Sequence, residues 1–202
     1  MGLFGPSKEE VWKELCEEIK GTLINEGFWK GSRVEVQYKN WKIYLDTYTV
    51  STGKSSITYT RLRAPFVHYR DFHFKIYERF GIISDIGKAL GMQDIEIGDS
   101  EFDKKYIIQG NNESIVKSIL SNTRVKDLIY LQPRIKLETK NNEGIFGPNF
   151  KDNESQLYFL VTGVIKDVQL LKIIFELFSV LLDEMALQGV ISEDTPSVQL
   201  YK

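Results

Sequence analysis

The sequence predicts an α+β fold, in which a curved, mainly antiparallel sheet has a long C-terminal helix packed on one face. From Arg33 to Ile76, apolar and polar residues alternate with a period of two residues, as they do in strands with one buried side. From Val168 to Leu187 the apolar repeat changes to that of a helix. The alternative is a more closed, barrel-like sheet capped by the same helix.

The alternating region predicts four strands, at residues 33–38, 41–45, 55–63 and 72–76. Short turns join the first three, so we expect an antiparallel meander in which the strands pair in chain order. Pro65 has no amide hydrogen to donate, so it ends the third strand or places it at an edge.

Capping residues and periodicity divide the rest of the chain. Ser7 and Glu10 form a capping box, which predicts a helix from about residue 8 to residue 24. Asp167 caps the long closing helix. The other expected elements are helices at 81–90, 115–120 and 122–129, strands at 94–97, 102–109, 135–140 and 157–164, and a loop at 141–155.

The length favours one domain. The chain has 202 residues, of which 42% are hydrophobic and 27% charged, as in an ordinary globular protein. We expect a single α+β domain over residues 1–188. Residues 189–202 have little to bury, so we expect them to form a flexible C-terminal tail.

The charge balance bears on partners and on location. Lys and Arg number 26 against 28 Asp and Glu, and the net charge of −2 gives no overall attraction to nucleic acid or to an anionic membrane. We therefore expect no nucleic-acid partner, and the polar stripe along the closing helix argues against a membrane span. Cys16 is the only cysteine, and residues 1–7 lack the pattern of a signal peptide. We expect a cytoplasmic protein with Cys16 in its core.

The sequence offers no catalytic constellation. No Ser–His–Asp or Cys–His arrangement can be assembled without free choice of partners along the chain, so we assign no catalytic residue and no cofactor. Gly53-Lys54-Ser55 ends like a phosphate-binding P-loop, but Tyr48 stands where that loop needs a glycine. Strand-like residues on both sides favour a hairpin turn instead.

The weak candidates for a metal site are His68 and His73, the only histidines. If a hairpin turns at Arg70-Asp71, the two imidazoles lie opposite each other on neighbouring strands. Such a pair could bind a metal, but a stable site needs a third and usually a fourth ligand. The alternative is two ordinary sheet histidines.

Five carboxylates lie within residues 94–103, where Asp99-Ser-Glu-Phe-Asp103 resembles the start of a calcium loop. Such a loop next requires Gly and, at its twelfth position, a bidentate Glu, whereas this chain has Lys104 and Gly110. Ile95 and Ile97 alternate with the acids, which favours the wet face of a strand over a cation site.

Arg61 and Arg63 share the predicted sheet with other basic residues and with aromatic residues. This is the chemistry of a surface that binds single-stranded nucleic acid. Acidic residues in the same region and the slightly acidic chain favour a solvated amphipathic sheet face instead. The other members are Lys42, Tyr44, Tyr48, Lys54, Tyr59 and Lys75.

Five stretches carry a resemblance to a known family. They are MGLFGPS (1–7), LDTYTVSTGK (45–54), GMQDIEIG (91–98), EFDKKYIIQG (101–110) and GVIKD (163–167). Together they resemble an uncharacterised family of bacterial, largely Bacillus-type, cytosolic proteins of unknown function. The resemblance implies a bacterial origin and a single co-inherited unit, and it implies no substrate, cofactor or catalytic residue.

These observations predict a non-catalytic binding or protein-interaction module, which could be a homodimer. Phe146 and Phe150, beside Gly and Pro in a loop, and Leu3 and Phe4, in the N-terminal arm, are the candidate contact residues. The alternative is that both Phe residues of the loop pack back on the core as a lid. The alternative function is a small-ligand- or metal-binding protein, or an enzyme, with a pocket between the sheet and the C-terminal helix.

Overall fold

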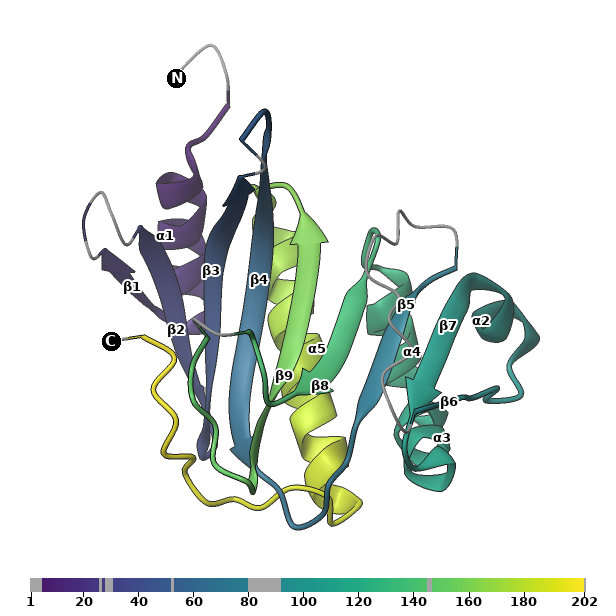
Figure 1. Cartoon of the computed structure of the whole chain (residues 1–202). Helices are drawn as coiled ribbons and strands as arrows, with labels where there is room; N and C mark the ends of the chain where they lie inside the picture. Colours follow the sequence, from purple (N-terminus) through teal and green to yellow (C-terminus); the bar gives the residue numbers. More distant parts are fainter. Residues whose placement is uncertain are drawn as a thin grey trace.

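A computed structural model describes residues 5–25, 27, 31–51, 53–79, 92–144 and 147–201. Its centre is one open sheet of nine strands in the order β1-β2-β3-β4-β9-β8-β5-β7-β6, and every pair is antiparallel (Figure 1). The predicted α+β class is confirmed, and the sheet does not close into the alternative barrel.

The elements follow one another along the chain as alternating groups of strands and helices. Their bounds are α1 (Lys8–Ile19), β1 (Thr22–Asn25), β2 (Ser32–Tyr38), β3 (Trp41–Ser51), β4 (Ser56–Val67), β5 (Phe74–Glu78), β6 (Gln93–Asp94), α2 (Ser100–Lys105), β7 (Tyr106–Gly110), α3 (Glu113–Ser121), α4 (Thr123–Tyr130), β8 (Lys136–Lys140), β9 (Glu154–Thr162) and α5 (Val168–Leu187).

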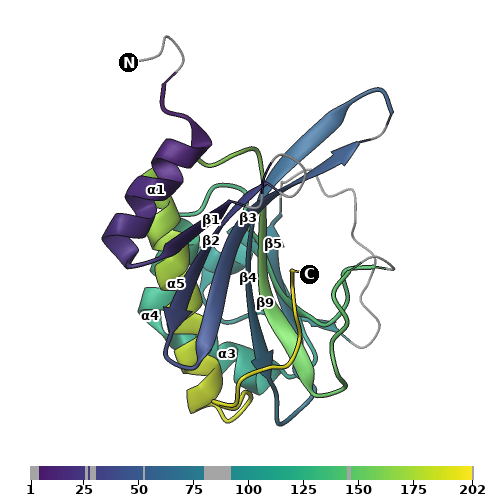
Figure 2. The same cartoon turned by 90° about the vertical axis from the view of Figure 1, so that its left-hand side faces the viewer.

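One face of the sheet is covered by helices. Figure 2 shows α1, α3, α4 and α5 on the same side of the strands, with α5 running along them. The alternation in β2 to β4 points Val34, Leu45 and Leu62 into this layer, where they are fully buried. Helix α5 presents Ile174, Phe178 and other apolar residues to the same core. Contacts of α5 with α1, α3 and α4 also cover its outer side, so a single chain buries most of this helix.

The predicted four-strand meander is wrong at its last strand. β2, β3 and β4 pair in chain order, but the other neighbour of β4 is β9. The strand predicted at 72–76 is β5, which lies between β8 and β7. The cause is that β9 is almost entirely buried and matches β4 over nine register pairs, from Tyr59↔Thr162 to Val67↔Glu154. Consecutive strands are often but not always neighbours.

Three local predictions also change. The first helix ends at Ile19, because Lys20 adopts a left-handed conformation, and the residues after it form the edge strand β1. The strand predicted at 102–109 begins as helix α2, since the side chain of Asp99 caps it by accepting a hydrogen bond from the amide of Phe102. The expected strand at 94–97 is reduced to Gln93–Asp94. The expected helix at 81–90 lies outside the described residues.

Side chains also cap the remaining helices, and the cap predicted for the closing helix, Asp167, is confirmed. Asn112, Asn122 and Asp167 each accept a hydrogen bond from a backbone amide in the first turn of α3, α4 and α5. Within the described ranges, no helix combines the length and the apolar character that crossing a membrane requires.

The C-terminal segment, residues 189–201, runs back from α5 across the helix-free face of the sheet (Figures 1 and 2). Our expectation that it has little to bury is wrong. Val190 and Ile191 are buried in the core, and Ile191 forms a β-bridge with His68. The segment therefore contributes specific contacts to the fold.

Candidate functional site

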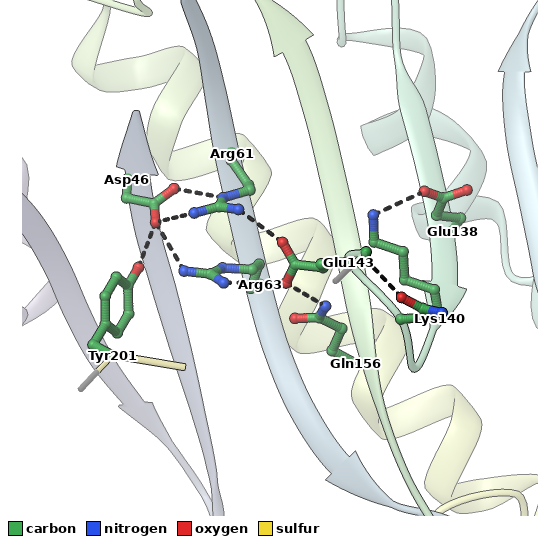
Figure 3. Close-up of polar contacts among 10 residues, drawn as sticks. Asp46, Arg61, Arg63, Glu138, Lys140, Glu143, Gln156 and Tyr201 are labelled. Atoms are coloured by element: carbon green, nitrogen blue, oxygen red, sulfur yellow. Dashed lines mark hydrogen bonds and ion pairs between the residues drawn. The ribbon is translucent and has the colours of Figure 1, made fainter. Parts of the chain in front are cut away.

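The sheet face that carries no helix holds a compact group of charged side chains. Asp46 on β3 lies directly opposite Arg61 on β4, and Arg63 follows two residues later on the same face. Glu143 reaches the two arginines from the loop after β8 (Figure 3). We call these four residues the ionic cluster.

The four charges form a closed ring, in which each arginine bridges both carboxylates. Arg61 lies 2.7 Å from Asp46 and 2.8 Å from Glu143, and Arg63 lies 2.9 Å from Asp46 and 3.1 Å from Glu143. Arg61 binds Asp46 through two parallel N–H donors, Nε and Nη2. Such bidentate pairing fixes the planes of both groups as well as holding them together.

The ionic cluster is largely removed from water. The exposed fractions of its side chains are 8% for Asp46 and Glu143, 15% for Arg61 and 3% for Arg63. The interpretation of a solvated face, which we drew from the sequence for these two arginines, is therefore wrong. Buried charges of this kind persist because the two positive and two negative groups neutralise one another.

The ring sets the protonation states of its members. Burial alone raises the pKa of Asp46, but the hydrogen bond from Arg61 and the charges of both arginines outweigh it, so this pKa lies below its ordinary value. Glu143 follows the same pattern, with Arg63 and a hydrogen bond from Gln156 lowering its pKa. All four groups therefore stay charged near neutral pH.

Tyr201 from the C-terminal segment covers one end of the ionic cluster. Its hydroxyl donates a 2.6 Å hydrogen bond to Asp46 (Figure 3). The guanidinium carbons of Arg33 and Arg63 lie 4.3 and 4.9 Å from the centre of its ring, and the ring of Tyr44 lies 5.5 Å away at 51°. These are favourable cation–π and tilted aromatic contacts.

A second group borders the ionic cluster on β8 and β9. The ammonium of Lys140 lies 3.3 Å from the ring centre of Tyr158 and 3.5 Å from Glu138. Burial lowers the pKa of Lys140, although the carboxylate of Glu138 opposes this effect. Two buried polar atoms of this face, Nε of Arg63 and Oε1 of Gln156, have no hydrogen-bond partner.

The structure does not bring the two histidines together as a cross-strand pair, because β4 and β5 are not neighbours. His68 forms its bridge with Ile191, and Nε2 of His73 lies 2.7 Å from Asp71. Searching the described part of the chain, we find no group of three or more His, Cys, Asp or Glu side chains able to hold a metal ion.

Three of the five acidic residues of 94–103 have structural partners. Asp99 caps α2 and pairs with Lys126 at 2.7 Å. Asp103 accepts hydrogen bonds from the amides of residues 97 and 98. Asp94 accepts one from Gln109. These contacts give Asp94, Asp99 and Asp103 roles in the local structure.

The predicted contact residues are only partly described. Leu3, Phe4 and Phe146 lie outside the described residues, and Phe150 is half-buried in the loop before β9. Cys16 is a free, buried thiol on α1, as predicted, and burial raises its pKa.

The space between the sheet and α5 offers little room for a ligand. Where β5, α3 and α5 meet, the gap is too narrow for a water molecule and is bounded only by apolar side chains, those of Phe74, Ile76, Val116, Ile119, Leu120 and Leu181. A shallow hollow of about 550 Å³ lies on the surface near Tyr130 and Ile173. Of its three charged residues, Lys105 and Glu78 pair with each other and Asp167 caps α5.

The comparisons with known proteins concern the fold. No family model matches the chain, and no curated protein matches it. Among solved structures, the chain is similar to the mycobacterial trehalose monomycolate transport factor A, TtfA, with a TM-score of 0.52 and 8% sequence identity. The match covers 88% of this chain and 94% of that one. At this identity the similarity shows the fold alone.

Sequence reasoning found half of the ionic cluster. Arg61 and Arg63 were singled out, and the alternation of β3 and β4 could have placed Asp46 beside them. The fourth member, Glu143, was missed because it contacts Arg61 across 82 residues of sequence. Tyr201, which covers the cluster, was missed because it contacts Asp46 across 155 residues. Such separations leave no trace in periodicity or spacing.

Proposed function

We propose that this chain is a non-catalytic protein-binding module and that its partner binds the helix-free face of β2, β3, β4 and β9. The observation that carries the proposal is that this face already holds a stretch of polypeptide, the C-terminal segment, through side-chain contacts. Two of these contacts are the hydrogen bonds from Ser197 to Glu154 and from Tyr201 to Asp46. A face that holds one extended segment has the chemistry to hold another.

The composition of the face supports the proposal. Tyr and Arg are the residues that most often dominate binding at protein interfaces. Next to the ionic cluster, the rings of Tyr48 and Tyr59 stack at 5.6 Å, and Arg61 lies 5.2 Å from the ring centre of Tyr48. Tyr48 and the nearby Ile57 are 39% and 42% exposed. An accessible apolar rim therefore adjoins a rigid charged centre.

The alternative, a ligand or catalytic pocket under α5, has less support, because the gap there is apolar and too narrow for water. The buried, unpaired thiol of Cys16 fits the reducing cytoplasm, where we propose that the protein acts.

Site-specific photo-crosslinking tests the proposal. The full chain would carry p-benzoylphenylalanine in place of Tyr48 on the helix-free face, or in place of Lys13 on the exposed side of α1, and would be irradiated in the cells that encode it. We expect a discrete crosslinked protein from position 48 and none from position 13. The same crosslinks from both positions, or none from position 48, would contradict the proposal.

The same variant also identifies the class of partner. Irradiating the purified protein alone gives a crosslinked dimer if the partner is a second copy of this chain, and light scattering then reports a dimer. A crosslink seen only in cells identifies a different protein.

A further inference from the structure

We propose that the helix-free face carries a pocket for a tyrosine side chain, that Tyr201 occupies it within the chain, and that a partner displaces residues 193–201 by inserting a tyrosine of its own. The occupant to which we commit is an extended protein segment with an unmodified tyrosine. This inference rests on the proposed function, because it states how the partner is recognised on that face.

The pocket has walls and a base on three strands. Arg33 on β2 and Arg63 on β4 contact the ring of Tyr201, while Tyr44 on β3 lies beside it. Asp46 on β3 accepts the hydroxyl hydrogen. Guanidinium groups on an aromatic ring and a carboxylate at its hydroxyl together select a phenol over an aliphatic side chain.

The pocket is held in shape by contacts that do not involve Tyr201. The Nε of Arg33 donates to Glu35 at 2.8 Å. Arg63 and Asp46 are fixed by the other members of the ionic cluster. A site whose walls are already positioned loses less entropy when it binds a new occupant.

The charges in the pocket specify the form of the tyrosine. Burial and the carboxylate of Asp46 raise the pKa of Tyr201, so the phenol stays protonated and can donate. A phosphorylated tyrosine would instead bring a negative group against the negative charge of Asp46. The partner that fits is therefore an unmodified tyrosine.

The attachment of residues 193–201 is suited to exchange. Within the described part of the chain, hydrogen bonds between two backbone groups join the segment to the sheet only as far as Ser192, whose amide donates to the carbonyl of Val67. Beyond that point, the amide and the hydroxyl of Ser197 donate to the carboxylate of Glu154, and the hydroxyl of Tyr201 donates to Asp46. Residues 193–195 are exposed. A segment held by a few side chains opens more easily than a paired strand.

The test adds the C-terminal segment to the protein as a separate peptide. A fluorescent synthetic peptide of residues 193–202 is titrated into the full-length wild type and the full-length Tyr201→Ala variant. We expect saturable binding to the variant, at least about tenfold tighter than to the wild type, whose pocket is occupied. A Tyr201→Phe peptide should bind about tenfold more weakly, because it lacks the hydrogen bond to Asp46. A Tyr201→Ala peptide should not bind.

Hydrogen exchange provides the folding control. In Tyr201→Ala, the amide of Ser197, which donates to Glu154, should exchange faster, while the amides of α5 keep the rates of the wild type. Equal binding of the tyrosine and alanine peptides, or no binding to a variant whose α5 is protected, would overturn the inference. So would a variant in which the amide of Ser197 exchanges as in the wild type.

The outcomes separate this inference from the proposed function. If position 48 captures a partner but the peptide does not bind, the tyrosine pocket fails and the binding face stands. If the peptide binds but position 48 captures nothing, the proposed function fails, and so does the displacement of the segment by a partner. A captured partner that binds Tyr201→Ala no more tightly than the wild type also overturns the displacement.

Discussion

The two faces of the sheet bury side chains by different physical means. On the helix-covered face, β2 to β4 and α5 exclude water with apolar groups such as Leu62 and Phe178. On the other face, Arg63 is as well buried as a core residue, but it is surrounded by carboxylates and the phenol of Tyr201. The first face gains stability from removing apolar area from water, whereas the second avoids a penalty only while its charges balance.

This difference predicts how each face responds to change. An apolar core loses stability in proportion to the volume removed and to the cavity left behind. A buried ring of charges responds to the loss of one member, because the remaining charges become unpaired. Replacing single residues on each face therefore separates the two mechanisms.

The largest effect is expected on the helix-covered face. Phe178→Ala removes a fully buried aromatic side chain from α5 and should lower the free energy of unfolding by about 3–5 kcal/mol. Urea unfolding followed by circular dichroism measures it. Leu187→Ala, at a position on the same helix that is 76% exposed, is the matched control and should cost less than about 0.5 kcal/mol. Equal losses for the two variants would show that α5 does not form the core as described.

The next largest effect is expected at the ionic cluster. Asp46→Ala leaves Arg61 and Arg63 with one carboxylate between them and should cost about 3 kcal/mol, although no large apolar group is lost. Arg124→Gln breaks the exposed pair with Glu176 and should cost less than about 1 kcal/mol. The double variant Asp46→Ala, Arg61→Ala should lose less than the sum of its single variants. Strict additivity would contradict the closed ring.

The sequence predicts the two faces unequally. Periodicity identified α5 and the helix-side residues of β2 to β4, because a buried apolar stripe is a local pattern. It could not place β9 beside β4, since strand order depends on which distant strand fits best. Nor could it recognise Glu143, which lies in a loop of ordinary polar composition, or Tyr201, which lies in a segment taken for a tail. The site is built from such distant residues, so its chemistry emerges only on folding.

The smallest effect concerns the dependence of stability on pH. The arginines hold the pKa of Asp46 and of Glu143 below their ordinary values of 3.8 and 4.5, against the opposing effect of burial. Between the folded and unfolded pKa values, the unfolded chain binds more protons than the folded chain. Stability from these carboxylates is therefore complete above about pH 4.5 and is lost as the pH falls through their folded values.

Urea midpoints measured from pH 7 down to pH 3 test this dependence. At pH 7 the Asp46→Asn, Glu143→Gln variant should be less stable than the wild type, because its arginines face neutral groups. As the pH falls, however, its urea midpoint should decrease less than that of the wild type. The other carboxylates are common to both proteins. A difference between the two slopes of urea midpoint against pH is therefore due to the ionic cluster. The apolar core has no proton to exchange, and Phe178→Ala should lower the midpoint without changing the slope. If the two slopes were equal, the carboxylates of the helix-free face would not be held ionised by the arginines, and the contrast between the faces would be lost.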